Sequence, residues 1–209
     1  MASLPPLATA ADLGTVPASA SSADIELALR WGSARVRRFT GQVFTFVENE
    51  TIELGGGDRV LQLPQRPLVV DATHPLTVVE IPGYAGVEIT LTEDTDFTRL
   101  GNELTRGDPR YPVGRLMGWP WSRVQGVWAP KVRVTHSHGY VDEIPDDVVE
   151  IVVDLAKINL SNPENLRSVA IDDYSRTFAA ETIGGARLSR DQKDDLRPYR
   201  RTAFSVKSS

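Results

Sequence analysis

Residues 131–156, KVRVTHSHGYVDEIPDDVVEIVVDLA, contain the transition that decides the fold. Apolar and polar side chains alternate as far as His138, which predicts a β-strand. Gly139 interrupts this pattern, and Pro145 followed by two aspartates is typical of the first turn of a helix. Apolar residues then recur at helical spacing, so we expect a helix over 146–160. The chain therefore passes directly from a sheet into a helical segment.

The predicted helix over 146–160 is apolar on two sides. A helix of this kind has to be covered on two sides. We expect one side to pack within its own chain and the other against a neighbouring copy of the same protein. The candidate subunit interface consists of Val148, Val149, Ile151, Val152, Val153 and Leu155.

Two further helices are expected. Ser22 is a suitable N-cap for a helix over 23–39, and Gly41 lies just beyond its arginine-rich end as a stop signal. Near the C-terminus, Ser189 and Gln192 form a capping box for a short helix that ends at Pro198. Between the last two helices, residues 169–180 are expected to be extended.

In the segment 42–137 apolar and polar residues alternate over short stretches, which predicts a series of short strands. Turn-forming residues separate these strands, and we interpret one such group, Gly55-Gly56-Gly57, as a hairpin turn. Such spacing indicates an antiparallel sandwich or barrel-like unit. The predicted fold class is α+β, with this β domain inserted into a small helical bundle formed by 22–41 and 138–198.

The two ends of the chain lack a regular pattern. Residues 1–21 are small, Ala-rich and broken by proline, and we expect a flexible arm. Residues 199–209, YRRTAFSVKSS, are expected to form a flexible basic tail that becomes ordered on contact with a partner. The candidate contact residues in this tail are Tyr199, Arg200, Arg201 and Phe204.

Composition excludes several classes of protein. The chain has no cysteine, so disulfides and thiolate chemistry are absent and production in a cytoplasm is expected. Its 23 basic and 28 acidic residues give a net charge of −5, which argues against a surface built to grip nucleic acid. No apolar run is long enough for a membrane span, and the N-terminus lacks the features of a secretory signal.

His136-x-His138-x4-Glu143 matches part of the first metal-binding motif of cupins. The glycines of that motif are missing, however, and the third histidine that it needs downstream could only be His74, which lies upstream. We therefore favour a structural role, in which the two imidazoles are neutral partners at a strand end. On this interpretation the protein needs neither a metal ion nor a cofactor.

No arrangement of residues indicates catalysis, so an enzyme is not expected. Trp119, Trp121 and Trp128 form an aromatic, proline-rich patch. A β-sandwich carbohydrate-binding module could use such a platform, but packing in a core or between subunits is the more economical interpretation.

The order of parts along the chain is distinctive. The first helix ends in SARVRRFTGQVF (33–44), the β segment contains RVLQLPQRPLVV (59–70), and a strand ends in THSHGY (135–140). A proline-initiated apolar helix, an Asn162-Pro163 break and LSRDQKDDLRPYRR (188–201) follow. In this order the chain resembles the head-to-tail adaptor, or connector, proteins of long-tailed bacteriophages.

The resemblance implies a structural virion protein assembled in the host cytoplasm. It implies a ring of about twelve copies, bound by heterologous contacts below the portal protein. Such a ring extends the DNA channel without sequence-specific binding and provides a platform for a neck stopper or tail component. Another neck or tail-completion protein is the nearest alternative, and a cupin-like metal-dependent enzyme or a carbohydrate-binding module is more remote.

Overall fold

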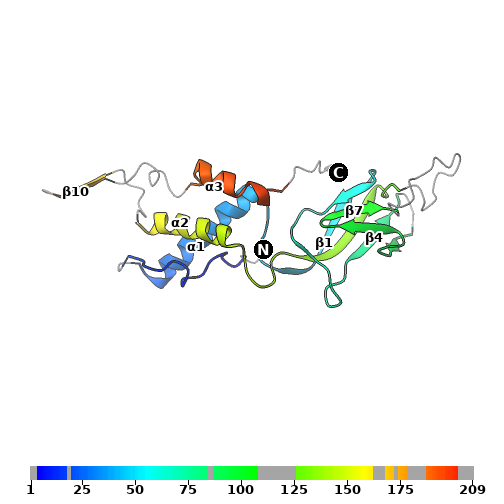
Figure 1. Ribbon diagram of the computed structural model, residues 1–209, viewed down its shortest axis with the longest axis horizontal. Coiled ribbons are helices and arrows are strands. Elements are labelled where there is room, and N and C mark those ends of the chain that lie inside the picture. Colours follow the sequence, from blue (N-terminus) through cyan, green and yellow to red (C-terminus); the bar gives the residue numbers. More distant parts are fainter. Residues whose placement is uncertain are drawn as a thin grey trace. The chain divides into compact units, whose positions relative to one another are not determined.

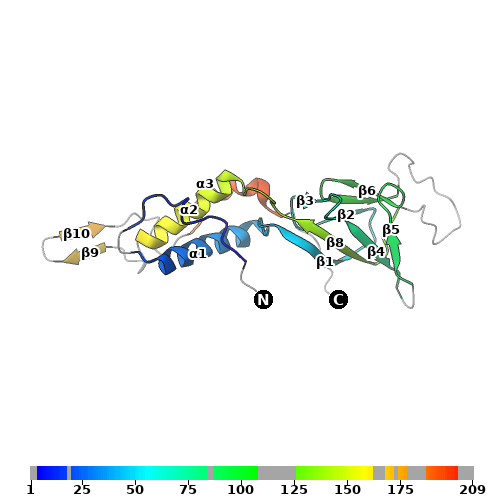
Figure 2. The same ribbon diagram turned by 90° about the horizontal axis from the view of Figure 1, so that it is seen from below.

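The computed structural model describes residues 4–17, 20–83, 87–107, 126–161, 168–171, 174–177 and 187–201. The chain forms two compact units. Unit 1 comprises Met1–Thr45 and Val141–Arg201, and unit 2 includes Phe46–Tyr140. Unit 1 is helical with one small hairpin, whereas unit 2 is built from β-strands (Figures 1 and 2).

Helix α1 (Ser22–Thr40) confirms the first predicted helix. Its N-cap is Ser21 rather than Ser22, because Ser21 and Asp24 form a reciprocal capping box. Gly41 ends the helix in the left-handed conformation, with φ of 71°, and its amide donates to the carbonyl of Arg37. The local signals in the sequence therefore set both ends of the helix to within one residue.

Helix α2 (Asp146–Ser161) confirms the central apolar helix. The carbonyl of Pro145 accepts from the amides of Val148 and Val149, so proline stands immediately before the helix. Helices α1 and α2 lie side by side in both views (Figures 1 and 2). Their closest approach is at Gly32, where the lack of a side chain leaves room for the backbone of Val152.

The N-terminal segment is not the flexible arm that we expected for 1–21. Leu7, Ala8 and Leu13 are buried, and the amide of Leu7 donates to the hydroxyl of Ser33 on α1. The guanidinium of Arg37 also donates to the carbonyl of Pro5. Leu7, Ala8 and Leu13 thus belong to the core of unit 1, and hydrogen bonds at Leu7 and Pro5 hold this segment against α1.

The C-terminal part of unit 1 begins with a hairpin of β9 (Ser168–Ile171) and β10 (Tyr174–Thr177), where an extended segment was predicted. Helix α3 (Arg190–Asp195) follows, with the predicted capping box between Ser189 and Gln192. A 3-10 turn, η3 (Arg197–Tyr199), then continues the chain, and Leu196 between them is fully buried.

Unit 2 is organised around β8 (Lys131–His138), the strand of the opening motif. One antiparallel sheet has the order β1-β8-β4-β5, and β3 pairs with the C-terminal end of β8 (Figure 2). The strands around β8 are β1 (Val47–Gly55), β3 (Leu68–Val69), β4 (Thr77–Ile81) and β5 (Ile89–Leu91).

A second antiparallel sheet has the order β2-β7-β6. Its strands are β2 (Val60–Gln62), β6 (Phe97–Leu100) and β7 (Glu103–Arg106). Apolar side chains from both sheets form one core, including Leu61, Val78, Leu104, Val132 and Val134. The fold is therefore mixed α+β with antiparallel sheets, as predicted.

The prediction of a hairpin turn at Gly55-Gly56-Gly57 is wrong. Strand β1 pairs with β8 and strand β2 pairs with β7, so the two strands flanking the glycines are not partners. The amides of Gly56 and Gly57 instead donate to the carbonyls of Pro130 and Trp128. Gly56 is required there by close packing, because a Cβ would lie 1.8 Å from the carbonyl oxygen of Ala129.

None of the helices in the described part of the chain is both long and apolar enough to cross a membrane.

Candidate functional site

The predicted subunit interface on α2 needs correction. Val148, Ile151, Val152, Val153 and Leu155 are all buried inside the isolated chain, and Val149 is half-buried. These side chains are therefore not available to a neighbouring copy. The two-sided apolar pattern was identified correctly, but the inference that one chain cannot cover both sides does not hold.

Helix α1 packs against α2, and other segments add buried side chains to unit 1. Gly32 allows α1 to approach Val152 and Leu155 closely. The N-terminal segment contributes the buried Leu7 and Leu13, and the chain after α3 contributes the buried Leu196. Segments distant in sequence thus contribute to the core of the helical unit.

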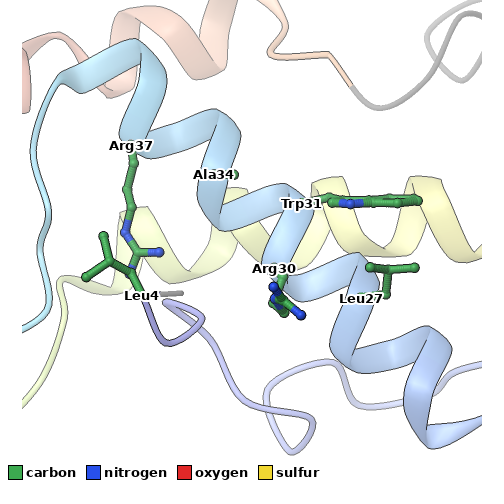
Figure 3. A pocket seen from close by; sticks show the side chains of 6 residues that line it. All are labelled: Leu4, Leu27, Arg30, Trp31, Ala34 and Arg37. Atoms are coloured by element: carbon green, nitrogen blue, oxygen red, sulfur yellow. The ribbon is translucent and has the colours of Figure 1, made fainter. Parts of the chain in front are cut away.

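One exposed apolar surface of unit 1 is formed by α1 and the segment that precedes it. Leu4, Leu27 and Trp31 are 43%, 40% and 53% exposed, respectively. Figure 3 shows Leu27 and Trp31 projecting from successive turns of α1. They border an open hollow, the Trp31 hollow, which is lined by Leu4, Leu27, Arg30, Trp31, Ala34 and Arg37.

The outer surfaces of α1 and α2 differ in charge. Helix α1 carries four arginines against two carboxylates, and Arg30, Arg35 and Arg38 are exposed. Helix α2 carries four carboxylates, Asp146, Asp147, Glu150 and Asp154, against the single Lys157, and all five are exposed. Unit 1 therefore presents a basic surface with an exposed tryptophan on one helix and an acidic surface on the other.

The predicted tail residues are held on unit 1 as far as Arg201. The hydroxyl of Tyr199 donates to both carboxylate oxygens of Asp147, at 2.9 and 2.8 Å. The guanidinium of Arg200 lies over the ring of Phe39, and the amide of Arg201 donates to the carbonyl of Thr40. The flexible tail was expected to begin at 199, but Tyr199 is bound to α2, and Arg200 and Arg201 contact the end of α1. Phe204 lies outside the described residues.

The two histidines of the opening motif lie on the inner face of β8. Val132, Val134, His136 and His138 share this face because side chains alternate along a strand. Both imidazoles are fully buried. In the antiparallel register Glu50 of β1 is the partner of His136, so its side chain lies on the same face.

The carboxylate that meets the histidines is therefore Glu50, not Glu143. Glu143 is exposed, and His74 pairs with Asp71 through Nδ1 at 3.1 Å. Glu50 was missed because its position depends on strand pairing across a separation of more than eighty residues. The available signal was the alternation of Glu50, Ile52 and Leu54, which places a carboxylate in line with two apolar side chains.

Burial lowers the pKa of His136 to about 4. The neighbouring His138 acts in the same direction, while the Glu50 carboxylate and the backbone of Val134 oppose the shift. His136 is therefore neutral at neutral pH, and one ring nitrogen keeps its lone pair.

The aromatic patch does not form an exposed platform at Trp128. Its ring is buried in the core of unit 2 beside Phe97, and its indole N–H donates to the carbonyl of Leu104. Trp119 and Trp121 lie outside the described residues. For Trp128 the structure supports the packing interpretation.

No protein-family model matches the sequence, and no curated protein matches it either. Among solved structures, one similar chain comes from the neck of an empty GTA particle computed with C6 symmetry. The similarity covers 98% of this chain and 95% of that chain, with 16% sequence identity and a TM-score of 0.47. Because the sequence identity and the TM-score are low, this similarity establishes neither a shared fold nor a shared activity.

Proposed function

We propose that this chain is a structural virion protein, a head-to-tail adaptor that forms a ring on the portal. The order of sequence parts supports the family, as described for 33–44, 59–70, 135–140 and 188–201. The observation that carries the proposal is the Trp31 hollow, an apolar surface left exposed on the helical unit. An exposed aromatic side chain with arginine beside it is typical of a surface that binds another protein.

The occupant of the Trp31 hollow is a second copy of the chain. The hollow is bordered by Arg30 and Arg37, whereas the outer side of α2 presents Asp146, Glu150 and Asp154 at helical spacing. Opposite charges on two different surfaces of one subunit favour contact between unlike surfaces of two subunits. Such heterologous contacts close into rings when the rotation between copies is suitable.

This arrangement replaces the interface that the sequence predicted on the apolar side chains of α2. The helix still takes part, but through its outer carboxylates and not through Val148 or Ile151. Tyr199 then has a structural role, since it ties the end of η3 to Asp147 of α2. The proposed portal contact of the tail begins beyond Arg201, in the segment that contains Phe204.

The net charge of −5 is compatible with a ring through which DNA passes. Affinity for the phosphate backbone grows with the number of cationic contacts. If the channel makes few cationic contacts with phosphate, the DNA passes through it without being held. The proposal therefore includes no sequence-specific binding and no catalytic activity.

The test combines the full-length chain with portal-containing particles encoded by the same genome. Native mass spectrometry of the isolated chain and electron microscopy of the particles would record its association. The proposal expects ring density on the portal, which Trp31→Ser reduces strongly and Leu100→Ser leaves unchanged. Leu100 is a matched control because it is 80% exposed and lies in unit 2.

Two results would contradict the proposal. Failure of the wild-type chain to join portal-containing particles would exclude the adaptor function. Association that is equal for wild type and Trp31→Ser would exclude the Trp31 hollow as the contact between copies. Attachment to an isolated tail tube and not to the portal would favour the tail-completion alternative.

A further inference from the structure

Three potential metal ligands meet at the C-terminal end of β8. Within the described part of the chain, Glu50, His136 and His138 form the only group of three or more such residues in which all ligand atoms lie within 4.8 Å of one another. The Nε2 atom of His138 lies 2.8 Å from Oε2 of Glu50. The two imidazole rings are 5.3 Å apart between centroids.

In the part of the chain that the structure describes, the protein around the two histidines supplies a partner for only one of their four ring nitrogens, Nε2 of His138. Both ring nitrogens of His136 and Nδ1 of His138 are buried without a hydrogen-bond partner among the described residues. A buried polar group left unpaired costs about 1–3 kcal/mol. The wholly unpaired imidazole of His136, beside the half-paired imidazole of His138, therefore needs an explanation that packing alone does not supply.

We propose that Glu50, His136 and His138 bind a divalent transition-metal ion, with Zn²⁺ as the preferred ion. Two imidazole nitrogens and one carboxylate oxygen are a donor set that Zn²⁺ accepts at about 2.0–2.2 Å. Tetrahedral coordination at such lengths puts donor atoms about 3.3 Å apart. The existing spacing reaches this value through small side-chain rotations.

The site has one open side. The two histidine side chains are fully buried, whereas the side chain of Glu50 is 41% exposed. Solvent can therefore reach the ion past the carboxylate and supply the fourth ligand. The two imidazole nitrogens favour Zn²⁺ over the harder Mg²⁺ and Ca²⁺, which prefer oxygen ligands.

The local backbone brings the carboxylate to the histidines. Val47 is the partner of His138 and Glu50 is the partner of His136, so β1 contains one extra residue between these pairs. At this bulge Asn49 has a φ of 51°, and its amide donates to the hydroxyl of Ser137. Bulges frequently redirect a side chain next to a functional site. A bound ion would join β1 to β8 at this irregular end of the sheet.

The third histidine provides the natural control. The His74 imidazole lies 3.1 Å from Asp71 and 3.9 Å from Glu48, at the surface of the same unit. Both carboxylates are more than half exposed, and Asp71 already accepts from the amides of Thr73 and His74. The His74→Ala and Glu48→Gln variants therefore remove an imidazole or a carboxylate without changing the proposed site.

The experiment uses the untagged full-length chain, freed of metal with a chelator. Zn²⁺ is titrated calorimetrically and Co²⁺ is titrated by visible absorption, which reports the coordination geometry of cobalt. The proposal expects one ion per chain, with cobalt bands of tetrahedral type and a higher Tm in the presence of Zn²⁺.

The variants Glu50→Gln and His138→Gln are expected to weaken binding by at least about tenfold, since losing even a hydrogen-bond partner of a ligand has such an effect. His74→Ala and Glu48→Gln are expected to bind as the wild type does. Circular dichroism confirms that each variant is folded, and Glu50→Gln is the mildest because the side chain is partly exposed.

The inference is overturned if the wild-type chain binds neither ion stoichiometrically. It is also overturned if Glu50→Gln and His138→Gln retain wild-type affinity, or if His74→Ala abolishes binding. Because these measurements use the isolated chain, their outcome does not depend on ring formation or on the portal.

Discussion

Gly32 of α1 faces the backbone carbonyl of Val152 of α2, and a Cβ added at Gly32 would lie 3.0 Å from that oxygen. The side chains of Val152 and Leu155 would be 3.4 and 3.5 Å away. A side chain at position 32 would therefore force the two helices apart or the neighbouring atoms to shift. This contact helps to bury α2 within a single subunit.

Replacing Gly32 by leucine is expected to destabilise unit 1 by about 1–3 kcal/mol, because the larger side chain has to separate the helices. Urea unfolding followed by far-UV circular dichroism would measure the change. Ala23→Leu, at an exposed position of the same helix, is the control and should change stability by less than about 0.5 kcal/mol. Equal stability of Gly32→Leu and Ala23→Leu would contradict the close packing.

The ion pair between Glu80 and Arg106 is buried in unit 2. The Nε of Arg106 lies 3.0 Å from Glu80, which also accepts from the amide of Ala129. Glu80→Leu is expected to cost about 3–5 kcal/mol, because it leaves the guanidinium buried without its counter-charge.

The matched control for Glu80 is Glu93, whose ion pair with Arg99 is partly exposed. Glu93→Leu should cost less than about 1 kcal/mol. Chemical denaturation monitored by the fluorescence of the buried Trp128 would compare the two variants. Similar losses in both would show that burial does not determine the contribution of Glu80.

Gly56 and Gly55 allow a comparison between neighbouring glycines. A Cβ at Gly56 would lie 1.8 Å from the carbonyl oxygen of Ala129, whereas a Cβ at Gly55 would meet nothing within 4 Å. Gly56→Ala is expected to destabilise unit 2 by about 1–3 kcal/mol or more, because the backbone has to move. Gly55→Ala should be close to neutral, and thermal unfolding of both variants would distinguish them. A neutral Gly56→Ala would show that the 128–130 segment is not held against this turn.

The capping box of α1 is expected to make helix stability dependent on pH. Hydrogen bonds from the side chain and then the backbone of Ser21 lower the pKa of Asp24 below 3.8. A carboxyl group with a lowered pKa stabilises the folded state above its unfolded pKa, and this contribution is lost as pH falls through the lower folded pKa. Replacing Ser21 removes the hydroxyl that caps the helix, at a cost of about 0.5–2 kcal/mol.

The difference in stability between wild type and Ser21→Ala should therefore be larger at pH 7 than at pH 3. Urea denaturation at the two pH values measures this difference. The Ser22→Ala variant is the control, because Ser22 is the first residue of the helix and not its cap. A difference that does not change with pH would exclude the contribution of Asp24.

The burial of α2 and the exposed surface of α1 illustrate why sequence patterns could not predict the tertiary packing. The pattern of α2 correctly predicted two apolar sides, but its buried side chains belong to a core of unit 1 that also contains Leu7, Leu13 and Leu196, which lie far away in the sequence. Periodicity describes one helix and contains no information about which distant segment packs on it. Trp31 lies within the helix predicted over 23–39, but only packing shows that its side chain is 53% exposed.

By itself, the sequence determined the features that depend on neighbouring residues. The helices, the capping boxes, the stop at Gly41 and the placement of His136 and His138 on one side of a strand all follow from short-range sterics and hydrogen bonding. Tertiary structure alone decided that Glu50 joins the histidines, because the register and bulge between β1 and β8 involve residues more than eighty positions apart. It also decided that α2 is buried within one subunit, since burial depends on every segment that can reach a surface.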